Sequence, residues 1–382
     1  MRICFIAHGN FTHIDAYLDH FKERGHEVHL VALAPGPRRE VPTHDVGAGE
    51  GLMRLPHKWS YLPAMLRART VIRRLAPDIV HAHYATSAGL AAWVCNAHPW
   101  LVTAHGTDVS LGVKSPIWRV LLRAIFRQAD CVNAVSEELH EMILRLGTIP
   151  TKIETFTLGI DTQRFKFSER ALLYPTKPLR LICTRRLEPV YDHATIIRSM
   201  AILKQRGTKF ILTIVGDGVL RQSLEVLAAE LNITDRITFA GTLPNTFLPA
   251  CLDEHDVFLS ASSRDGTSLC LLEAMASGLY PVVSEIRANA EWIKHGRNGC
   301  LHKVGDPESL ANCIESLLSG LEQTRAALVP NREAVIKRGD RAANMLRLEE
   351  IYCQLSASTG SARRSGHSPH RSCRAEAAAP IK

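Results

Sequence analysis

The sequence has no uninterrupted apolar run of the roughly 18 residues that a membrane-spanning helix requires. Its first residues, MRICFIAHGN, contain too short an apolar stretch for a signal peptide and predict a first β-strand instead. The ten cysteines form no CxxC pair and show no metal-ligand spacing. We therefore expect a cytoplasmic protein with reduced thiols, and neither a disulfide framework nor a zinc site.

Two recognition motifs are also missing. No G-x-G-x-x-G follows the first predicted strand, which argues against a nicotinamide-type dinucleotide site. No nucleic-acid recognition module is visible, so we expect no nucleic-acid partner. Charged residues make up 22% and hydrophobic residues 46% of the chain, as is typical of a soluble globular protein.

The positive charge is concentrated in one part of the chain. The formal net charge is +8, and residues 51–129 contain ten Lys and Arg against two acids. Arg119, Arg123 and Arg127 recur at four-residue spacing on one face of a predicted helix. The aromatic residues that accompany these cations are Trp59, Tyr61 and Trp118. A solvated helix face and peripheral binding to an anionic surface at the inner face of the membrane both explain this composition.

Strands and helices alternate along two long stretches of the sequence. A chain of 382 residues is long enough for two domains, and each alternating stretch predicts a doubly wound, Rossmann-like parallel sheet of the α/β class. The predicted parts are an N-terminal domain over 1–165, a linker over 166–178, a C-terminal domain over 179–335, a helix over 336–355 that packs back on the N-terminal domain, and a disordered basic tail over 356–382.

Polar turns follow many of the predicted strands. They lie at residues 8–9, 105–108, 185–186, 216–218 and 265–268. Ligands of doubly wound sheets bind at the carboxyl ends of the strands. These turns therefore predict a site between the two domains.

The stretch 256–283 gives the most specific of these signals. It predicts a buried strand, a glycine-bearing turn and a helix that Thr267 and Ser268 can cap. The free N–H groups at that helix start suit a diphosphate, and the carboxylates of Asp265 and Glu273 suit the hydroxyls of a sugar or ribose. Helix caps and an ordinary surface acid explain the same residues equally well, and this stretch alone does not decide between the two interpretations.

The order and spacing of these motifs resemble glycosyltransferase family 4, which comprises retaining enzymes with the GT-B fold of two facing Rossmann-like domains. The resemblance extends to about Leu355 and is densest over 181–301. The family's two acids, separated by seven residues, are present as Asp265-GTSLCLL-Glu273. Other matching segments are TAHGTD (103–108), LGIDTQRF (158–165), VGDG (215–218) and NAEWI (289–293).

The resemblance implies a nucleotide-diphosphate sugar donor, a UDP- or GDP-sugar, bound against the C-terminal domain. Glu273 would accept hydrogen bonds from the ribose hydroxyls, and Asp265 would hold the hydroxyls of the donor sugar. The backbone N–H groups of Gly266, Thr267 and Ser268 would lie nearby.

Further roles follow from the same resemblance. Arg186, in the segment RRLEPV, matches the arginine that neutralises the diphosphate, with Arg185 as an additional cation. Gly9 would let the N-terminal backbone approach the diphosphate, and His105 would contact the donor sugar near the reacting carbon. The expected catalytic residues are therefore His105, Asp265 and Arg186.

The sequence departs from the family pattern at two positions. The first acid is normally Glu and is here Asp265, and Tyr191 occupies the position of a usual lysine, five residues after Arg186. We expect either weaker donor binding or a compensating cation elsewhere. His81 and His83, on a predicted strand, are interpreted as structural residues.

The sequence contains no DxD motif. In the scheme that the resemblance implies, a helix N-terminus and an arginine stabilise the leaving diphosphate, so neither a metal nor a cofactor is expected. Retention would proceed by front-face attack, because no convincing nucleophile for a double displacement is present.

These observations predict a retaining, metal-independent, hexosyltransferase-type enzyme that transfers a sugar to a glycan or lipid-linked acceptor in cell-envelope polysaccharide biosynthesis. Two alternatives stay open: a catalytically silent nucleotide-sugar-binding protein, which Tyr191 suggests, and another GT-B enzyme such as a nucleotide-sugar epimerase. The sugar and the acceptor are not identified, since the acceptor contacts are expected in the proline-rich connection over 35–63.

Overall fold

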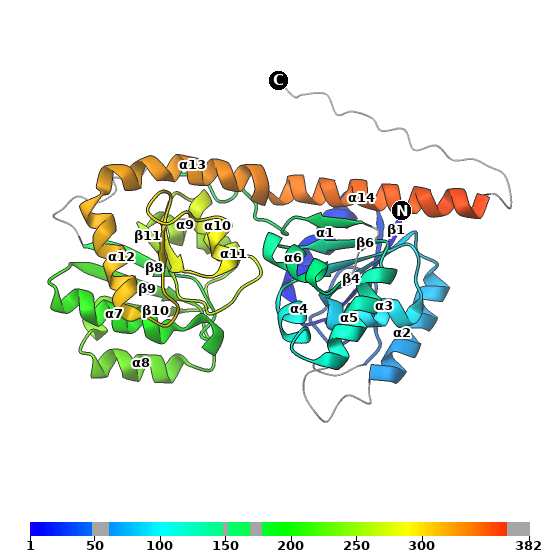
Figure 1. Cartoon of the computed structure of the whole chain (residues 1–382), viewed down its shortest axis with the longest axis horizontal. Coiled ribbons are helices and arrows are strands. Elements are labelled where there is room, and N and C mark those ends of the chain that lie inside the picture. The colour runs from blue at the N-terminus through cyan, green and yellow to red at the C-terminus, as the bar shows by residue number, and fades with distance from the viewer. Residues whose placement is uncertain (48–60, 148–151, 169–177, 365–382) are drawn as a thin grey trace, which may run out of the picture.

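Two domains of strands and helices lie side by side, and two consecutive C-terminal helices run along both of them (Figure 1). The computed structural model describes residues 1–47, 61–147, 152–168 and 178–364. Most of the predicted linker and part of the proline-rich connection, including Trp59, lie outside these ranges. Within them, no helix is both long and apolar enough to cross a membrane.

The sheet of the N-terminal domain is parallel, with the strand order β3-β2-β1-β4-β5-β6-β7. Its strands are β1 (Arg2–Ala7), β2 (Glu27–Ala32), β3 (Thr43–Asp45), β4 (Ile79–His83), β5 (Trp100–Ala104), β6 (Cys131–Ala134) and β7 (Ile153–Thr155). Its helices are α1 (Asp15–Glu23), α2 (Tyr61–Leu75), α3 (Leu90–Cys95), α4 (Thr107–Gly112), α5 (Pro116–Gln128) and α6 (Glu137–Arg145). The strand order reverses between β1 and β4, and doubly wound sheets bind ligands at such a reversal.

The sheet of the C-terminal domain is also parallel, with the order β10-β9-β8-β11-β12-β13. Its strands are β8 (Leu179–Cys183), β9 (Phe210–Val215), β10 (Ile237–Gly241), β11 (Val257–Ser260), β12 (Tyr280–Ser284) and β13 (Cys300–His302). Its helices are α7 (His193–Gln205), α8 (Arg221–Glu230), α9 (Leu248–Asp253), α10 (Leu269–Ala276), α11 (Arg287–Ala290) and α12 (Pro307–Ser319). The two sheets confirm the predicted α/β class with two doubly wound domains.

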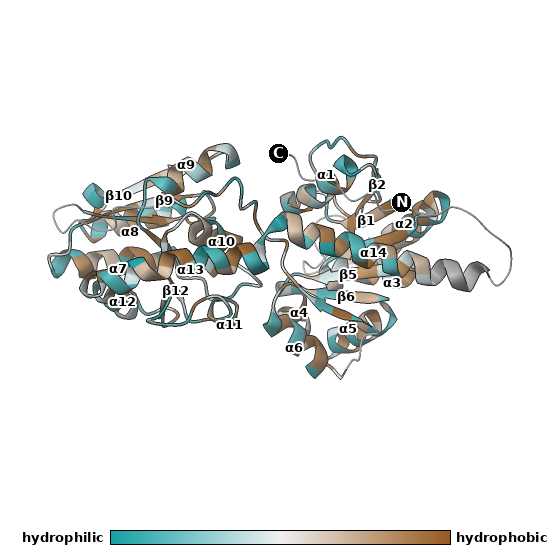
Figure 2. Cartoon of the chain, turned by 90° about the horizontal axis from the view of Figure 1, so that it is seen from above, coloured by the Kyte–Doolittle hydropathy of each residue, from teal (hydrophilic) through white to brown (hydrophobic). Residues whose placement is uncertain are grey.

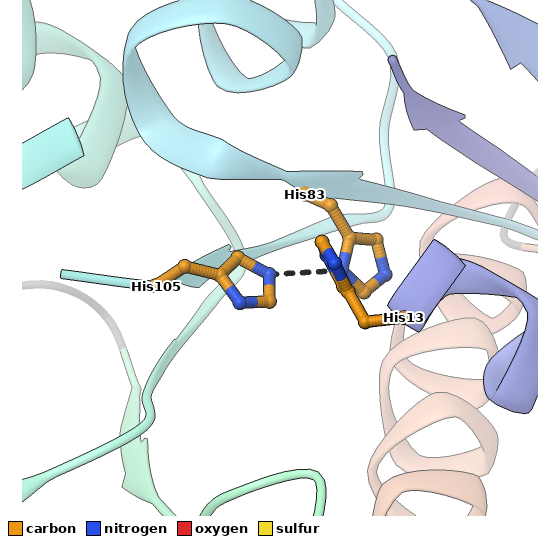
Figure 3. Close-up of side chains that lie close together, drawn as sticks. All are labelled: His13, His83 and His105. Carbon is orange, nitrogen blue, oxygen red and sulfur yellow. Dashed lines mark hydrogen bonds between the residues drawn. The ribbon is translucent and has the colours of Figure 1, made fainter. Parts of the chain in front are cut away.

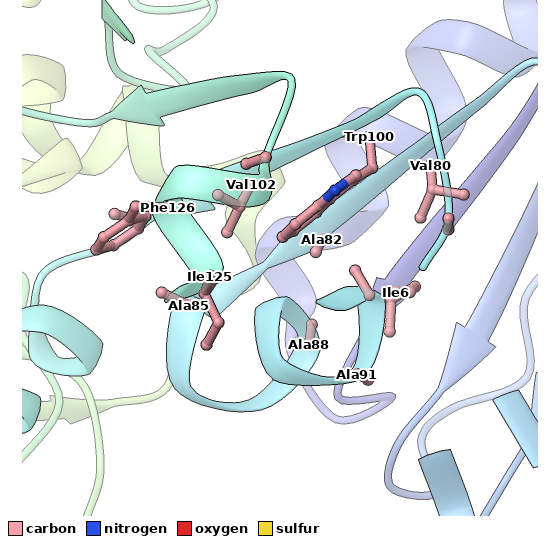
Figure 4. Packing of buried hydrophobic residues seen from close by; sticks show 14 of the residues in the cluster. Ile6, Val80, Ala82, Ala85, Ala88, Ala91, Trp100, Val102, Ile125 and Phe126 are labelled. Carbon is pink, nitrogen blue, oxygen red and sulfur yellow. The ribbon is translucent and has the colours of Figure 1, made fainter. Parts of the chain in front are cut away.

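Aromatic and aliphatic side chains fill the space between each sheet and its helices. In the N-terminal domain, Trp100 on β5 and Phe126 on α5 are fully buried in one cluster (Figure 4). The indole N–H of Trp100 donates to the carbonyl of Gln128 at 3.2 Å, so its polar edge is satisfied. Hydrophilic and hydrophobic residues are mixed along α5 and α14, as expected of helices that cover a core on one side (Figure 2). This packing fixes the strand ends from which the candidate site is built.

Helices α13 (Leu321–Gly339) and α14 (Arg341–Arg364) correct two expectations. A single helix was expected over 336–355, whereas residues 336–339 are the end of α13, which contains Pro330, and α14 begins at Arg341. The helix α14 continues through Arg364, so residues 356–364 are helical, whereas the sequence predicted a disordered tail from 356 onward. A helix that is already formed propagates at little cost per residue, and this segment contains no proline. Residues 365–382 of that tail lie outside the described residues.

Helix α14 packs on the N-terminal domain. Tyr352 is fully buried and stacks on Phe21 with ring centroids 5.0 Å apart. Its hydroxyl group forms a hydrogen bond with Nδ1 of His81 on β4, and Nε2 of His81 is 2.7 Å from the hydroxyl of Thr103 on β5. His81 therefore has the structural role that we expected.

A disulfide between Cys300 and Cys313 corrects the expectation that all cysteines are reduced. Cys300 lies on β13 and Cys313 on α12, which packs against that strand and brings the two Cα atoms to 5.8 Å. This pairing has no local signal in the sequence, because it depends on tertiary packing and not on a CxxC spacing. None of the other described cysteines forms a disulfide.

Candidate functional site

A cavity of about 640 Å³ lies between the two domains. The N-terminal domain lines it with residues at the end of β5 and on helices α4 and α6, and the C-terminal domain with the turns after β11 and β12. Its lining includes Gly106, Thr107, Lys114, Glu138, Arg264, Asp265 and Arg287. The cavity therefore lies where the polar strand-end turns predict a site.

The start of helix α10 follows the turn after β11 that lines the cavity on the C-terminal-domain side. The hydroxyl oxygen of Ser268 accepts a hydrogen bond from the N–H of Leu271 at 3.3 Å and so caps the helix, as expected. Thr267 does not cap it: its hydroxyl donates to the carbonyl of Val135, in the other domain, at 2.7 Å. The predicted strand, turn and helix of this stretch are thus present, and Thr267 connects the turn to the facing domain.

Asp265 forms an ion pair with Arg185, the residue two positions after the end of β8. The Arg185 side chain is 9% exposed and that of Asp265 is 19% exposed, so little water screens the pair. The guanidinium group of Arg185 also lies 4.2 Å from the ring centroid of Tyr191. Tyr191, at the usual lysine position, therefore supports a neighbouring cation. The arrangement was not predicted, because Asp265 follows β11 whereas Arg185 and Tyr191 lie in the connection between β8 and α7.

The next residue, Arg186, has the opposite environment. Its side chain is 77% exposed, and its guanidinium group is 3.6 Å from the carboxylate of Glu188. Arg186 is therefore available to a ligand, whereas Arg185 is held by Asp265.

Glu273 lies on α10, one helical turn beyond the cap. Burial raises the pKa of its carboxyl group to about 7, against the opposing effect of the positive charges of Arg341, Arg164 and Arg185. A carboxyl group that is about half ionised at neutral pH is unusual on a protein surface and is typical of a functional site.

His105 follows β5 on the N-terminal-domain side. Its backbone N–H and that of Gly106 donate to the carboxylate of Asp108 at 3.2 and 2.9 Å, and this carboxylate also accepts from the N–H of Ala85 at 2.7 Å. Asp108, in the first turn of α4, is therefore buried and fixes the backbone that carries the His105 ring.

The imidazole of His105 belongs to a cluster with His83 and His13 (Figure 3). Nε2 of His105 is 3.1 Å from Nδ1 of His83, and the ring of Tyr84 stacks on His105 with centroids 4.4 Å apart. Burial is the main cause that lowers the pKa of all three histidines, to about 4 for His13 and well below 6.5 for the other two. All three rings are therefore neutral at pH 7.

The cluster was not predicted from the sequence. His83 was interpreted as structural, and His13 was not considered. The period of a strand places His81 and His83 on the same face, and their rings are 4.1 Å apart. Since His105 follows the neighbouring strand, in which Thr103 pairs with His83, this register was the available signal.

Close backbone packing explains why residue 9 is a glycine. A Cβ atom at this position would lie 2.3 Å from the carbonyl oxygen of Ala34 and 2.9 Å from the backbone nitrogen of Gly36. The Gly9 N–H donates to that same Ala34 carbonyl at 2.9 Å. This contact explains a glycine at this position without a ligand.

Contacts across the cavity hold the domains together. The Glu291 carboxylate at the end of α11 accepts hydrogen bonds from the N–H groups of Glu137 and Glu138, which begin α6, at 3.2 and 2.9 Å. Arg287 pairs with Glu141 at 2.7 Å. The structure is therefore a closed arrangement of the two domains.

Two family models match consecutive parts of the chain. The model described as Glycosyltransferase Family 4 matches residues 9–164, and the one described as Glycosyl transferases group 1 matches residues 165–335. The chain belongs to the family 4 glycosyltransferases. This glycosyltransferase is 29% identical over 279 residues to the amylovoran biosynthesis glycosyltransferase AmsK of Erwinia amylovora. The aligned residues cover 70% of this chain and 67% of AmsK.

Solved structures are similar to this glycosyltransferase over nearly its whole length. Sucrose-phosphate synthase of Thermosynechococcus elongatus has a TM-score of 0.79 at 20% identity, covering 94% of this chain and 100% of that chain. Anabaena HepE in complex with UDP and glucose has a TM-score of 0.74 at 17% identity, covering 93% and 100%. These similarities confirm the GT-B fold.

Proposed function

We propose that this glycosyltransferase moves a sugar, with retention at the anomeric carbon, from a UDP- or GDP-sugar to a glycan or lipid-linked acceptor in cell-envelope polysaccharide biosynthesis. The observation that carries the proposal is the close approach of the Asp265–Gly266 turn to His105: a Cβ atom on Gly266 would lie 2.3 Å from the His105 carbonyl oxygen. This approach joins the start of α10 to the neutral histidine at the end of β5. The similarity to AmsK, which is named for amylovoran biosynthesis, supports the polysaccharide context.

The donor would bind to the C-terminal domain. Ionised Glu273 would accept hydrogen bonds from the ribose hydroxyls, and the exposed guanidinium group of Arg186 would reach the diphosphate. Asp265 would hold the sugar hydroxyls, with Arg185 positioning its carboxylate. HepE, whose structure contains UDP and glucose, supports a nucleotide sugar as the donor.

The transfer would use only groups of this chain and its substrates. The acceptor hydroxyl attacks the anomeric carbon on the face from which the diphosphate leaves, the bond from that carbon to the diphosphate oxygen breaks, and the acceptor proton passes to that oxygen. The N–H groups at the start of α10 and Arg186 stabilise the charge on the leaving group. The neutral ring of His105 adds no positive charge beside the developing oxocarbenium ion, and this scheme requires neither a metal nor a cofactor.

A silent nucleotide-sugar-binding protein is the main alternative, because Tyr191 replaces the usual lysine. Arg185, stacked on Tyr191, supplies a cation in the same region, which favours an active enzyme. The two acids at the start of α10 argue against the epimerase alternative.

A panel of nucleotide sugars in a thermal-shift assay tests the proposal. We expect a UDP- or GDP-sugar to stabilise the wild type and to be hydrolysed slowly by it. Glu273→Ala would lose the shift, whereas Glu230→Ala, an exposed acid on α8, would keep it. Failure of every nucleotide sugar to bind would overturn the proposal, and binding without hydrolysis or transfer would favour the silent protein.

We further propose that α5 contacts an anionic membrane surface. Ile117 and Val120 are 73% and 62% exposed, and Arg119 and Arg123 are exposed on the same helix. Reversing the charges of Arg119 and Arg123 should abolish co-sedimentation with anionic vesicles. Unchanged co-sedimentation would leave these arginines as a solvated helix face.

A further inference from the structure

We propose that His13, His83 and His105 form a binding site for a divalent transition-metal ion of the Zn²⁺ class, and that an ion bound there withholds His105 from sugar transfer. The first part of this inference stands on the cluster alone. The second part rests on the proposed role of His105 in transfer.

The geometry of the cluster suits an imidazole-bound ion. One ring nitrogen from each histidine lies within 4.8 Å of one from each of the other two. Nδ1 of His83 and Nε2 of His105 are 3.1 Å apart. Two imidazole nitrogens on one tetrahedral zinc ion are separated by about 3.3 Å, given Zn–N bonds of about 2.0–2.1 Å. The His83 and His105 pair is therefore already close to the spacing of two ligands.

The cluster also has unused hydrogen-bonding capacity. Nε2 of His13 is buried and has no hydrogen-bond partner among the described residues. His83 itself is 0% exposed. A buried polar atom without a partner is destabilising, and a metal ion gives an imidazole nitrogen a strong partner. The unpartnered atom of His13 favours a ligand over simple packing of the rings.

Surrounding side chains hold the rings in place. Phe11 stacks on His13 with ring centroids 5.4 Å apart, Tyr84 stacks on His105, and Tyr17 meets His83 edge-on at 4.5 Å. The Asp108 carboxylate receives the His105 backbone N–H, and no Lys or Arg contributes to the lowered pKa of any of the three histidines. Because the rings are neutral, no proton must leave before an ion binds.

Three protein ligands leave a fourth position open. His13 and His105 are half-buried while His83 is fully buried, so the open position faces the side from which His105 would meet the sugar. An ion coordinated by His105 fixes that ring and places a double positive charge beside a carbon that becomes positive during transfer. The ion would therefore inhibit the enzyme.

A second group of ligating residues, His295, Cys300 and Cys313, provides an internal control. Its two cysteines form a disulfide and offer no thiolates. Metal bound there after reduction would have sulfur ligands, whereas the histidine cluster offers only nitrogen. The two sites are distinguishable by spectroscopy.

The test uses the full chain, freed of metal with a chelator, in the absence of substrates. Titration with Zn²⁺ against a chromophoric chelator should give one ion per chain, and Co²⁺ should give the visible absorption of a tetrahedral site without a thiolate charge-transfer band. His13→Gln should weaken Zn²⁺ binding at least tenfold, and Cys300→Ser and His140→Gln should leave it unchanged. Equal affinity in the wild type and His13→Gln, or no binding, would overturn the inference.

The activity assay separates the two parts. Zn²⁺ should inhibit transfer by the wild type, a chelator should reverse the inhibition, and His13→Gln should remain active and resist it. Binding of Zn²⁺ at the cluster with no loss of transfer would support the site and contradict both its inhibitory effect and the proposed role of His105.

Discussion

The strand ends of the two domains face each other with opposite chemistry. On the N-terminal domain, His83 and His105 at the ends of β4 and β5 are desolvated and neutral. On the C-terminal domain, Arg185 and Asp265 after β8 and β11 are charged and paired. Both sets of residues come from the same kind of turn, so burial and partners, and not position in the fold, decide whether a strand-end residue carries charge.

This difference suggests a division of tasks. A nucleotide diphosphate carries its negative charge on one side of the bond that breaks, and the charged domain suits that side. The reacting carbon becomes positive as the bond breaks, and the uncharged histidines suit it because they add no repulsion. Substitutions that mix the two chemistries test this division.

Substitutions of the adjacent Arg185 and Arg186 should give the largest contrast in stability and transfer rate. Arg185→Met leaves the buried Asp265 carboxylate without its partner, and we expect a loss of about 3–5 kcal/mol in unfolding free energy, together with loss of transfer. Arg186→Met should change the unfolding free energy by no more than about 0.5 kcal/mol, since the side chain is exposed. It should nevertheless slow transfer by about 100-fold, as when one charge-stabilising donor is removed.

Urea unfolding and transfer rates on the same preparations measure both effects. The double variant Arg185→Met with Asp265→Asn should recover much of the stability and none of the activity. If Arg185→Met were as stable as the wild type, the ion pair would not organise the charged side of the cavity.

Donor affinity should depend on pH through Glu273. Burial raises its pKa to about 7, and only the ionised carboxylate accepts hydrogen bonds from both ribose hydroxyls. Affinity should therefore be full above pH 7 and fall as the pH drops through 7, by up to about tenfold for each pH unit below it. Calorimetry with UDP and GDP from about pH 6 to about pH 8 measures this dependence.

Glu273→Gln provides the control for that profile. It should bind the nucleotide more weakly than the wild type at high pH and with no step near pH 7. A step of the same size in Glu273→Gln would assign the titration to another group.

The contact of Glu291 with the start of α6 should have a smaller effect. Glu291→Gln weakens a charge-assisted cap, which is worth about 1 kcal/mol at a helix N-terminus. Because the cap joins the two domains, we expect the radius of gyration in X-ray scattering to increase. Glu322→Gln, in the first turn of α13, is the matched control. An unchanged radius of gyration in Glu291→Gln would show that other contacts keep the domains closed.

Tyr191 should show the smallest effect, and only for some substitutions. Arg185 contacts its ring face, so Tyr191→Phe should retain transfer and stability. Tyr191→Lys removes the ring and adds a cation beside Arg185, and it should reduce stability by about 0.5–2 kcal/mol. A gain of donor affinity in Tyr191→Lys without loss of stability would show that the usual lysine was simply missing.

The sequence was sufficient for the fold and for the strand, turn and helix over 256–283. Buried parallel strands can be recognised as short apolar runs in the sequence. The turn and the helix cap at Ser268 are predicted by neighbouring residues and do not depend on tertiary contacts. It was not sufficient for features that depend on tertiary packing. We therefore did not predict the Cys300–Cys313 disulfide or the helix α13 around Pro330. We also predicted too early an end for α14.

The candidate site shows the same limit. Asp265 and Glu273 were predicted because they lie on one continuous stretch, and Arg186 because it matches a family motif. The Arg185 pairing and the cluster of His13 with His83 could not be found this way, since their members come from different turns. Whether an arginine or histidine is buried is decided by its neighbours in space.

The most direct test of the division between the two domains measures donor binding and transfer separately in Glu273→Ala and His105→Gln. Calorimetry gives the affinity for the nucleotide sugar, and a transfer or donor-hydrolysis assay gives the rate on the same samples. We predict that Glu273→Ala loses donor binding, while His105→Gln binds the donor as the wild type does and loses turnover. Equal loss of binding in both variants would contradict the account, because the neutral histidine would then belong to the donor-binding side.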